Sequence, residues 1–142
     1  MDTLLVAYDF SDSSKKAAQF AIKLAEKFHS HIWLLNVVEP EPEFIGFKTG
    51  PKTVREQVAL EYHADYKKLQ DLEKELRKNY SNISALSVQG ATVDTILSQA
   101  DKLDASLILV GSHSKTNLKI LLLGSVSENV VKSSTRPVLV CR

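Results

Sequence analysis

One segment of the sequence gathers small and hydroxyl-bearing residues that could bind a phosphate group. The run Gly111-Ser112-His113-Ser114-Lys115 is followed, ten positions after Ser114, by Gly124-Ser125 at the expected start of a helix. Backbone N–H groups beside glycine can approach an anion closely, serine hydroxyls can donate to it, and a helix N-terminus carries partial positive charge. The segment therefore predicts a phosphate site. The same residues also fit a structural role, in which Gly111 turns the chain and Ser125, three residues before Glu128, starts a capping box.

Two other polar residues stand near these segments. Asp9 ends the first apolar run, where its carboxylate could cap the following helix. His113 lies within the candidate loop, but its neighbours include no carboxylate to orient it as a base, so we expect it to contact the ligand or to take no part. The chain has neither G-x-x-x-x-G-K-[ST] nor G-x-G-x-x-G after its first strand, which argues against a Walker loop and against dinucleotide binding.

Hydrophobic periodicity predicts the elements that position these residues. Short apolar runs indicate strands at 4–8, 31–38, 83–88, 106–110 and 138–141, and spacings of three and four indicate helices ending near 28 and spanning 53–80, 93–103 and 125–134. Strict alternation implies parallel strands with right-handed crossovers, hence an open three-layer α/β/α sheet. Ligands bind such sheets beyond the carboxyl ends of strands where strand order reverses. We therefore expect the site in the loops after the first and fourth strands.

The faces of two helices can also be predicted. In the first, the packed face should contain Ala17, Phe20, Ala21, Leu24, Ala25 and Phe28. In the long charged helix, the apolar stripe should contain Val58, Tyr62, Tyr66, Leu69, Leu72, Leu76 and Tyr80. The segment Glu39–Pro51, rich in proline and glycine, predicts a loop whose apolar residues cover a ligand, contact a partner or pack locally.

Composition bounds the class of protein. The chain has 142 residues, 44% apolar and 25% charged, with a net charge of +1, which predicts one domain over 1–142 and argues against nucleic-acid binding. A single cysteine, Cys141, excludes an intrachain disulfide and favours a reducing, cytoplasmic location. The first residues do not resemble a signal peptide, and the apolar runs are far shorter than the roughly 20 residues of a membrane span. We expect no membrane association.

Several motifs together resemble the universal stress protein family over nearly the whole chain. They are Val6-Ala7-Tyr8-Asp9-Phe10-Ser11 with Ser14, Leu34-Leu35-Asn36-Val37-Val38, Gly111-Ser112-His113-Ser114 through Gly124-Ser125-Val126-Ser127, and Pro137-Val138-Leu139-Val140. The family's ATP-binding branch carries G-x-x-G, nine residues, then G-[ST]. This chain keeps two of the three glycines and has Ser114 at the second.

The resemblance implies a Rossmann-like sheet of the adenine nucleotide alpha hydrolase type, with strand order 3-2-1-4-5, that binds ATP, ADP or AMP, with Mg²⁺, in stress signalling. It places Asp9 near the ribose and magnesium, and Ala7 and Val37 beside adenine. It assigns the ribose and phosphates to Gly111, Ser112, Ser114, Gly124, Ser125, Val126 and Ser127, with His113 and Lys115 in the same loop. It also implies a homodimer through Val138, Leu139 and Val140, and at most slow ATP hydrolysis. The alternative is a dimeric interaction protein without nucleotide, with Ser114 marking the loss.

Overall fold

The structure is a computed structural model that describes the backbone of residues 1–40, 52–113 and 123–142, and the side chains of the same ranges except 52–62. Strands and helices alternate along the described chain, as the periodicity predicts. Their bounds are β1 (Thr3–Ala7), α1 (Asp12–Phe28), β2 (His31–Val38), α3 (Lys52–Arg77), β3 (Ile83–Gln89), α4 (Thr92–Lys102), β4 (Leu107–Gly111), α5 (Ser125–Ser133) and β5 (Val138–Cys141).

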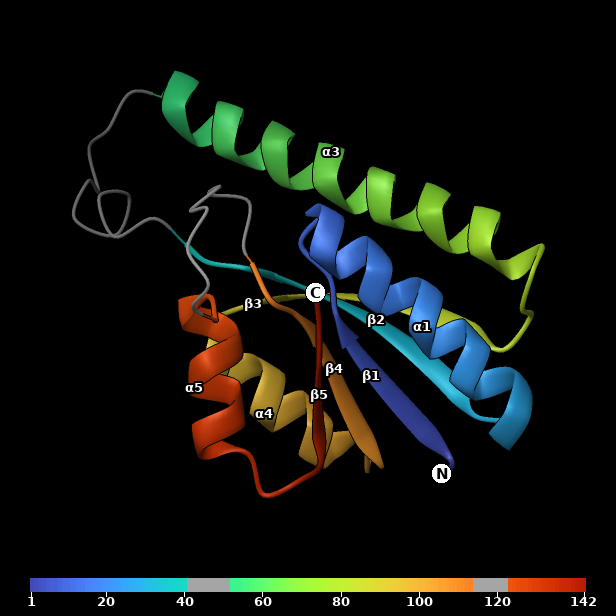
Figure 1. Ribbon diagram of the computed structural model, residues 1–142. Coiled ribbons are helices and arrows are strands. Elements are labelled where there is room, and N and C mark those ends of the chain that lie inside the picture. The colour runs from blue at the N-terminus through green and yellow to red at the C-terminus, as the bar shows by residue number, and fades with distance from the viewer. Residues whose placement is uncertain (41–51, 114–122) are drawn as a thin grey trace.

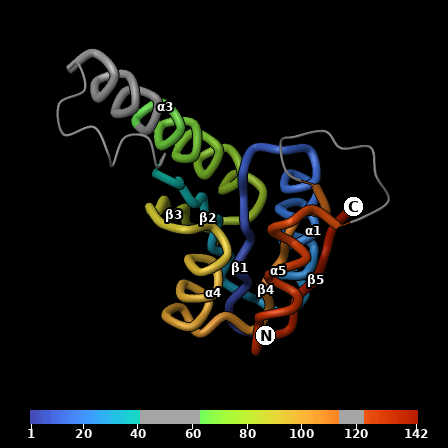
Figure 2. The backbone as a smooth tube through the Cα atoms, turned by 90° about the vertical axis from the view of Figure 1, so that its left-hand side faces the viewer, coloured from blue at the N-terminus to red at the C-terminus, as the bar shows by residue number. Residues whose placement is uncertain are grey.

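The five strands form one parallel sheet in the order β3-β2-β1-β4-β5, which confirms the predicted fold class. Helices α1 and α3 cover one face of the sheet and α4 and α5 cover the other (Figure 1; Figure 2). The chain moves from β1 outward to β3, and α4 then carries it back across the sheet to β4. Strand order therefore reverses between β1 and β4, so the loops that follow these two strands diverge from a common point.

The core lies on both faces of the sheet because the central strands are apolar at consecutive positions. Leu4, Leu5 and Val6 of β1 are all fully buried, with alternate residues in the two opposite core layers. Leu4 and Val6 pack with α1 and α3, whereas Leu5 packs with α4 and α5. A strand covered on both faces requires this continuous apolar sequence.

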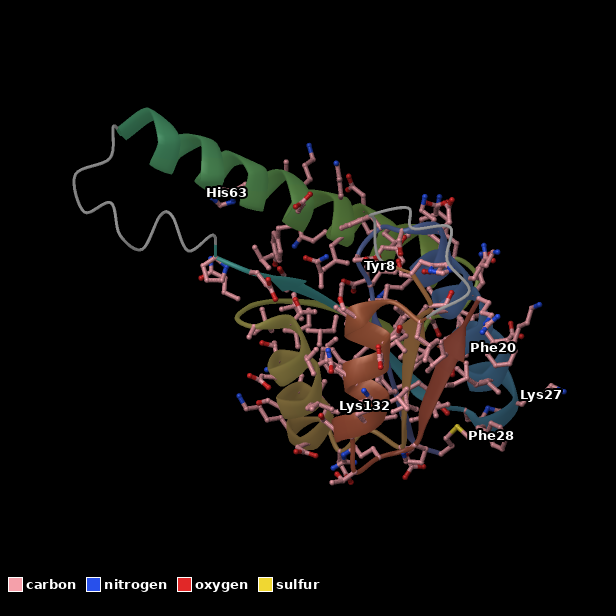
Figure 3. All side chains as sticks on the ribbon, turned by 60° about the vertical axis from the view of Figure 1, so that its left-hand side comes forward. Tyr8, Phe20, Lys27, Phe28, His63 and Lys132 are labelled. Carbon is pink, nitrogen blue, oxygen red and sulfur yellow. The ribbon has the colours of Figure 1, made fainter. Side chains whose placement is uncertain are left out.

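The packed face of α1 differs from the prediction at its aromatic residues. Phe20 and Phe28 are 41% and 50% exposed, and Figure 3 shows both rings at the margin of the molecule. The buried face is made of small side chains, namely Ser13, Ser14, Ala17, Ala18, Ala21 and Ala25. Small side chains let the helix axis approach β1 and β4 closely, which leaves no room beneath the helix for an aromatic ring.

The stripe on α3 is confirmed only over its C-terminal half. Leu69 is buried and Leu72, Leu76 and Tyr80 pack against the same core, but Tyr66 is 42% exposed. A helix of 26 residues is about 39 Å long, longer than any strand it could cover, so its N-terminal half extends beyond the sheet (Figure 1). The expected contributions of Val58 and Tyr62, and the proposed roles of the loop up to Pro51, fall outside the described side chains. Within the described ranges, no helix combines the length and apolarity needed to cross a bilayer.

Candidate functional site

A pocket opens at the carboxyl ends of β1, β2 and β4, where strand order reverses. With its opening to solvent it occupies about 540 Å³. Eight residues expected at the site line it, namely Ala7, Asp9, Val37, Gly111, His113, Gly124, Val126 and Ser127. The pocket thus lies where a ligand was expected, beyond the ends of the first and fourth strands.

One end of this pocket is apolar and bounded by main-chain groups of β2. Its apolar side chains are Ala7, Leu35, Val37 and Ile96, from β1, β2 and α4, whereas Val110 and Val126 line the pocket from β4 and α5. The Tyr8 N–H donates to the Leu35 carbonyl at 2.8 Å, so the main-chain groups of Leu35 point toward β1. Backbone groups of alternate strand residues point to the same edge, so the N–H and C=O of Val37 point the same way, beyond Ala7, where β1 has ended. This end can hold a flat apolar group whose rim makes hydrogen bonds.

Asp9 lines the polar end of the pocket and belongs to a tight turn. Its Oδ1 accepts from the Ser11 N–H at 3.0 Å, and Phe10 between them has a φ of 64°. A bulky residue rarely adopts this left-handed conformation. The Phe10 ring is held by packing on the core and by an edge-to-face contact with Tyr8, with ring centroids 5.1 Å apart.

The N-cap of α1 is Ser11 and not Asp9. The Ser11 Oγ accepts from the Ser14 N–H at 3.2 Å, which is the hydrogen bond of a helix N-cap. The capping role that the sequence left open for Asp9 is therefore wrong. The carboxylate stabilises the preceding turn through one oxygen and faces the pocket.

Gly111 ends β4 and contacts the first turn of α1. A Cβ at this position would lie 2.8 Å from the Ser13 carbonyl carbon and 2.8 Å from the Ser14 nitrogen, which is closer than Cβ atoms in proteins approach other heavy atoms without a bond between them. Gly111 pairs with Cys141 in the sheet. Close packing of β4 against α1 therefore explains why a glycine stands at position 111. The alternative role, in which Gly111 only turns the chain, is wrong.

Ser112 lies beside the pocket and not in its lining. Its N–H donates to the Cys141 carbonyl and its carbonyl accepts from the Gly124 N–H, each at 2.7 Å. Two residues beyond Val110, it faces the α5 side of the sheet. The residue is only 2% exposed, and within the described part of the chain its Oγ has no hydrogen-bond partner.

Helix α5 begins at the pocket with a glycine cap. Gly124 is the N-cap and has extended dihedral angles, φ −60° and ψ 157°. Ser125 is the first helical residue, so the predicted capping box is wrong, and Glu128 instead pairs with Lys132 at 2.9 Å. The first N–H groups of a helix have no acceptor within it, so this end can bind an anion.

Besides Ser112, one expected site residue lies outside the lining, and two fall outside the described residues. The Ser125 side chain is exposed and borders a neighbouring pocket that also contains Glu39, Asp94 and Asn129. Ser114 and Lys115 lie outside the described residues, so their placement stays a prediction.

Sequence reasoning missed several lining residues, above all those of α4. They are Tyr8, Ser11, Ser14, Leu35, Thr92, Ile96 and Val110. Thr92 and Ile96 follow the third strand, where no site was expected. The available signal was that α4 must carry the chain back across the sheet, which brings its N-terminus to the point of reversal.

Electrostatics around the pocket follow from burial and hydrogen bonds. Burial raises the pKa of Tyr8 above its ordinary value, and the charges of Asp9 and Glu75 raise it further. The Glu39 carboxylate accepts from the Thr92 hydroxyl at 2.7 Å and from its N–H at 2.9 Å, and these bonds lower the pKa of Glu39. Glu39 thereby caps α4 from a distance, since the N-cap, Ala91, has no side chain that can do so.

Comparison with known proteins agrees with this architecture. A model of the universal stress protein family matches residues 1–142. The universal stress protein YxiE of Bacillus subtilis is 32% identical, over 98% of this chain and 97% of its own. The solved structure of MJ0577, a protein of Methanocaldococcus jannaschii, has a TM-score of 0.81 at 29% identity, covering 99% of this chain and 94% of that one. A universal stress protein solved in complex with cAMP has a TM-score of 0.70 at 25% identity, covering 99% and 96%. The chain therefore belongs to the universal stress protein family.

Proposed function

We propose that this chain binds an adenine nucleotide, ATP or its shorter relatives, and acts as a nucleotide-dependent module in stress signalling. The observation that carries the proposal is the two-ended pocket, apolar beside Val37 and rich in donors at the start of α5. A nucleotide has the same two ends, a flat base and a phosphate chain. A family relative bound to cAMP is consistent with this ligand class.

The base would occupy the apolar end. Ala7 and Ile96 contribute side chains to its walls, and the Val37 N–H and C=O point to its rim. A main-chain donor beside a main-chain acceptor matches the ring nitrogen and the amino group along one edge of adenine. Guanine presents a carbonyl and an N–H there, the reverse polarity, so the proposal favours adenine.

The phosphates would lie at the start of α5, and the residues present fit that charge. The helix N-terminus supplies N–H donors, and Gly124 brings no side chain between them and the pocket. Among the described residues nothing pairs with the buried Oγ of Ser112, which by alternation from Val110 lies on the α5 side of the sheet. Leaving a buried hydroxyl unpaired is unfavourable, so a bound ligand or water that reaches it would be stabilised.

Magnesium would be held by Asp9 together with the phosphates. Within the described residues no group of three metal-ligating side chains exists. Mg²⁺ commonly uses one or two carboxylates and substrate phosphates, so a single aspartate at the pocket is compatible with it. When bound, the ion would neutralise phosphate charge.

We propose binding as the function, and turnover as slow at most. The described lining contains no arginine or lysine that could stabilise charge developing on a transferred phosphoryl group. The reducing, cytoplasmic location expected from the single cysteine remains part of the proposal.

We also propose a homodimer through β5. Within the described sheet β5 has a neighbour on one side only, and Val138, Leu139 and Val140 are half-buried. The opposite edge, β3, is covered by side chains of α3. The Ala85 N–H donates to Glu73 at 3.2 Å and Arg77 donates to the Ile83 carbonyl at 2.8 Å. An uncovered edge strand favours pairing with another chain, so β5 is the better candidate. A single-subunit mass at micromolar concentration would refute the dimer.

Calorimetric titration with ATP and Mg²⁺ tests the nucleotide proposal. We expect heat with a dissociation constant below about 1 mM, a binding free energy beyond about −4 kcal/mol, and weaker binding of GTP. No heat up to that concentration would refute nucleotide binding, and an intact dimer would then favour the interaction-protein alternative.

A pair of valine variants tests the location of the site. The backbone angles of Gly124 are open to valine, so Gly124→Val should fold, while its side chain enters the phosphate end and abolishes the heat. Ser133→Val, at the exposed last position of the same helix, is the matched control and should bind as the unaltered protein does. Unchanged binding by Gly124→Val would show that the phosphates lie elsewhere.

A further inference from the structure

One serine hydroxyl joins the start of α1 to His113, the second residue beyond the end of β4. Ser13 is the second residue of α1 and is 7% exposed. Its Oγ donates to the His113 carbonyl at 2.6 Å and accepts from the His113 N–H at 3.3 Å. A single side chain therefore holds both main-chain groups of a residue 100 positions away.

The approach that allows this contact depends on Gly111. A Cβ there would crowd the Ser13 Oγ itself, besides the backbone of Ser13 and Ser14. Gly111 and Ser13 thus act as one unit, in which the missing side chain of one admits the hydroxyl of the other. Neither the glycine nor the serine shows this in the sequence, because the two residues lie far apart along the chain and meet only where α1 packs on the end of β4.

The same hydroxyl also connects the two loops that form the polar end of the pocket. The Ser13 Oγ lies 3.4 Å from the Ser11 Oγ, and the Ser11 N–H donates to Asp9. His113, Asp9 and Ser11 line the pocket, whereas Ser13 does not. Any effect of Ser13 on a ligand must therefore pass through the residues that it holds.

We infer that Ser13 is a positioning residue for the phosphate half of the site, acting by fixing the His113 backbone at the start of the loop. This inference rests on the proposed function. The base half is built from β2 and α4, through Val37 and Ile96, and lies outside the set of residues that Ser13 bonds. The two halves should therefore respond differently when the hydroxyl is removed.

The test compares Ser13→Ala with Ser30→Ala in titrations with AMP and with adenosine. Ser30 is a matched control because it is fully buried and its Oγ also donates to a main-chain carbonyl, that of Met1, near the opposite end of α1. For Ser13→Ala we expect AMP affinity to fall about fivefold, the size of one lost hydrogen bond, and adenosine affinity to stay within about twofold. Ser30→Ala should leave both affinities within about twofold of the unaltered protein.

A second readout does not require ligand. The amide hydrogen of His113 should exchange with solvent faster in Ser13→Ala than in the unaltered protein. In Ser30→Ala it should exchange at the rate of the unaltered protein. Equal losses of AMP and adenosine affinity, or unchanged AMP affinity, would overturn the inference. If the unaltered protein binds neither compound, the proposed function fails first, and with it the phosphate role of Ser13. If it binds both and Ser13→Ala loses neither, only the inference fails.

Discussion

Replacing Ser112 with alanine should stabilise the unliganded protein and weaken nucleotide binding. Ser112 is 2% exposed, its hydroxyl oxygen is buried, and within the described residues nothing pairs with that oxygen. In the unfolded chain the hydroxyl bonds to water. Burying it unpaired costs about 1–3 kcal/mol, so its removal should return about 1 kcal/mol once some relaxation is allowed for.

Urea denaturation of the unliganded protein measures this effect. We expect the midpoint of unfolding to rise for Ser112→Ala at unchanged slope, which is the signature of a change in stability alone. Titration with ATP should show weaker binding by the same variant, because the hydroxyl facing α5 is no longer available to the ligand.

Ser30→Ala again provides the matched control, and its expected change in stability has the opposite sign. Its buried hydroxyl is hydrogen-bonded to the Met1 carbonyl, so its loss should destabilise the protein by about 1 kcal/mol and leave ATP affinity unchanged. If Ser112→Ala is as destabilising as Ser30→Ala, the Ser112 hydroxyl is paired in the unliganded protein, and the reasoning from its burial is refuted.

Three further predictions follow from single contacts. Gly111→Ala should lower stability by about 1–3 kcal/mol, measured by thermal unfolding, because its Cβ would lie 2.8 Å from the backbone of Ser13; a loss under about 0.5 kcal/mol contradicts the packing argument. The Thr92 hydrogen bonds lower the pKa of Glu39, so they stabilise the folded protein fully above the ordinary glutamate pKa of 4.5, and this stabilisation is lost as pH falls through the lower pKa of the folded state. Urea unfolding at a series of pH values should show a smaller loss of stability at acid pH for Glu39→Gln than for the unaltered protein. An unchanged pH profile counts against the contact. Burial raises the pKa of the Cys141 thiol, so iodoacetamide at neutral pH should label it far more slowly than in urea, and equal rates would show that β5 opens readily.

The sheet could be predicted because its information is local. Residues 4–6 and 31–38 are apolar at nearly every position, and only strands covered on both faces tolerate that sequence. Alternation with helices then restricts the connections to right-handed crossovers, and this places a site beyond the first and fourth strands. Gly111 and Gly124 could be expected there from the glycines and serines that follow the fourth strand, and Asp9 from the family resemblance.

Tertiary structure decided which surfaces and groups meet. Helical periodicity placed Phe20 and Ala21 on one face of α1. Because α1 lies close to the sheet, Ala21 is buried there and the Phe20 ring is left exposed. The Ser13 bond to His113 spans 100 positions, so no local pattern contains it. The burial of the Ser112 hydroxyl, with no partner in the described part of the chain, likewise depends on what surrounds it after folding. The sequence by itself determined the elements and the end of the sheet where a site is expected, because periodicity and chain order are local properties. The contacts that surround the pocket arise only when distant segments pack together.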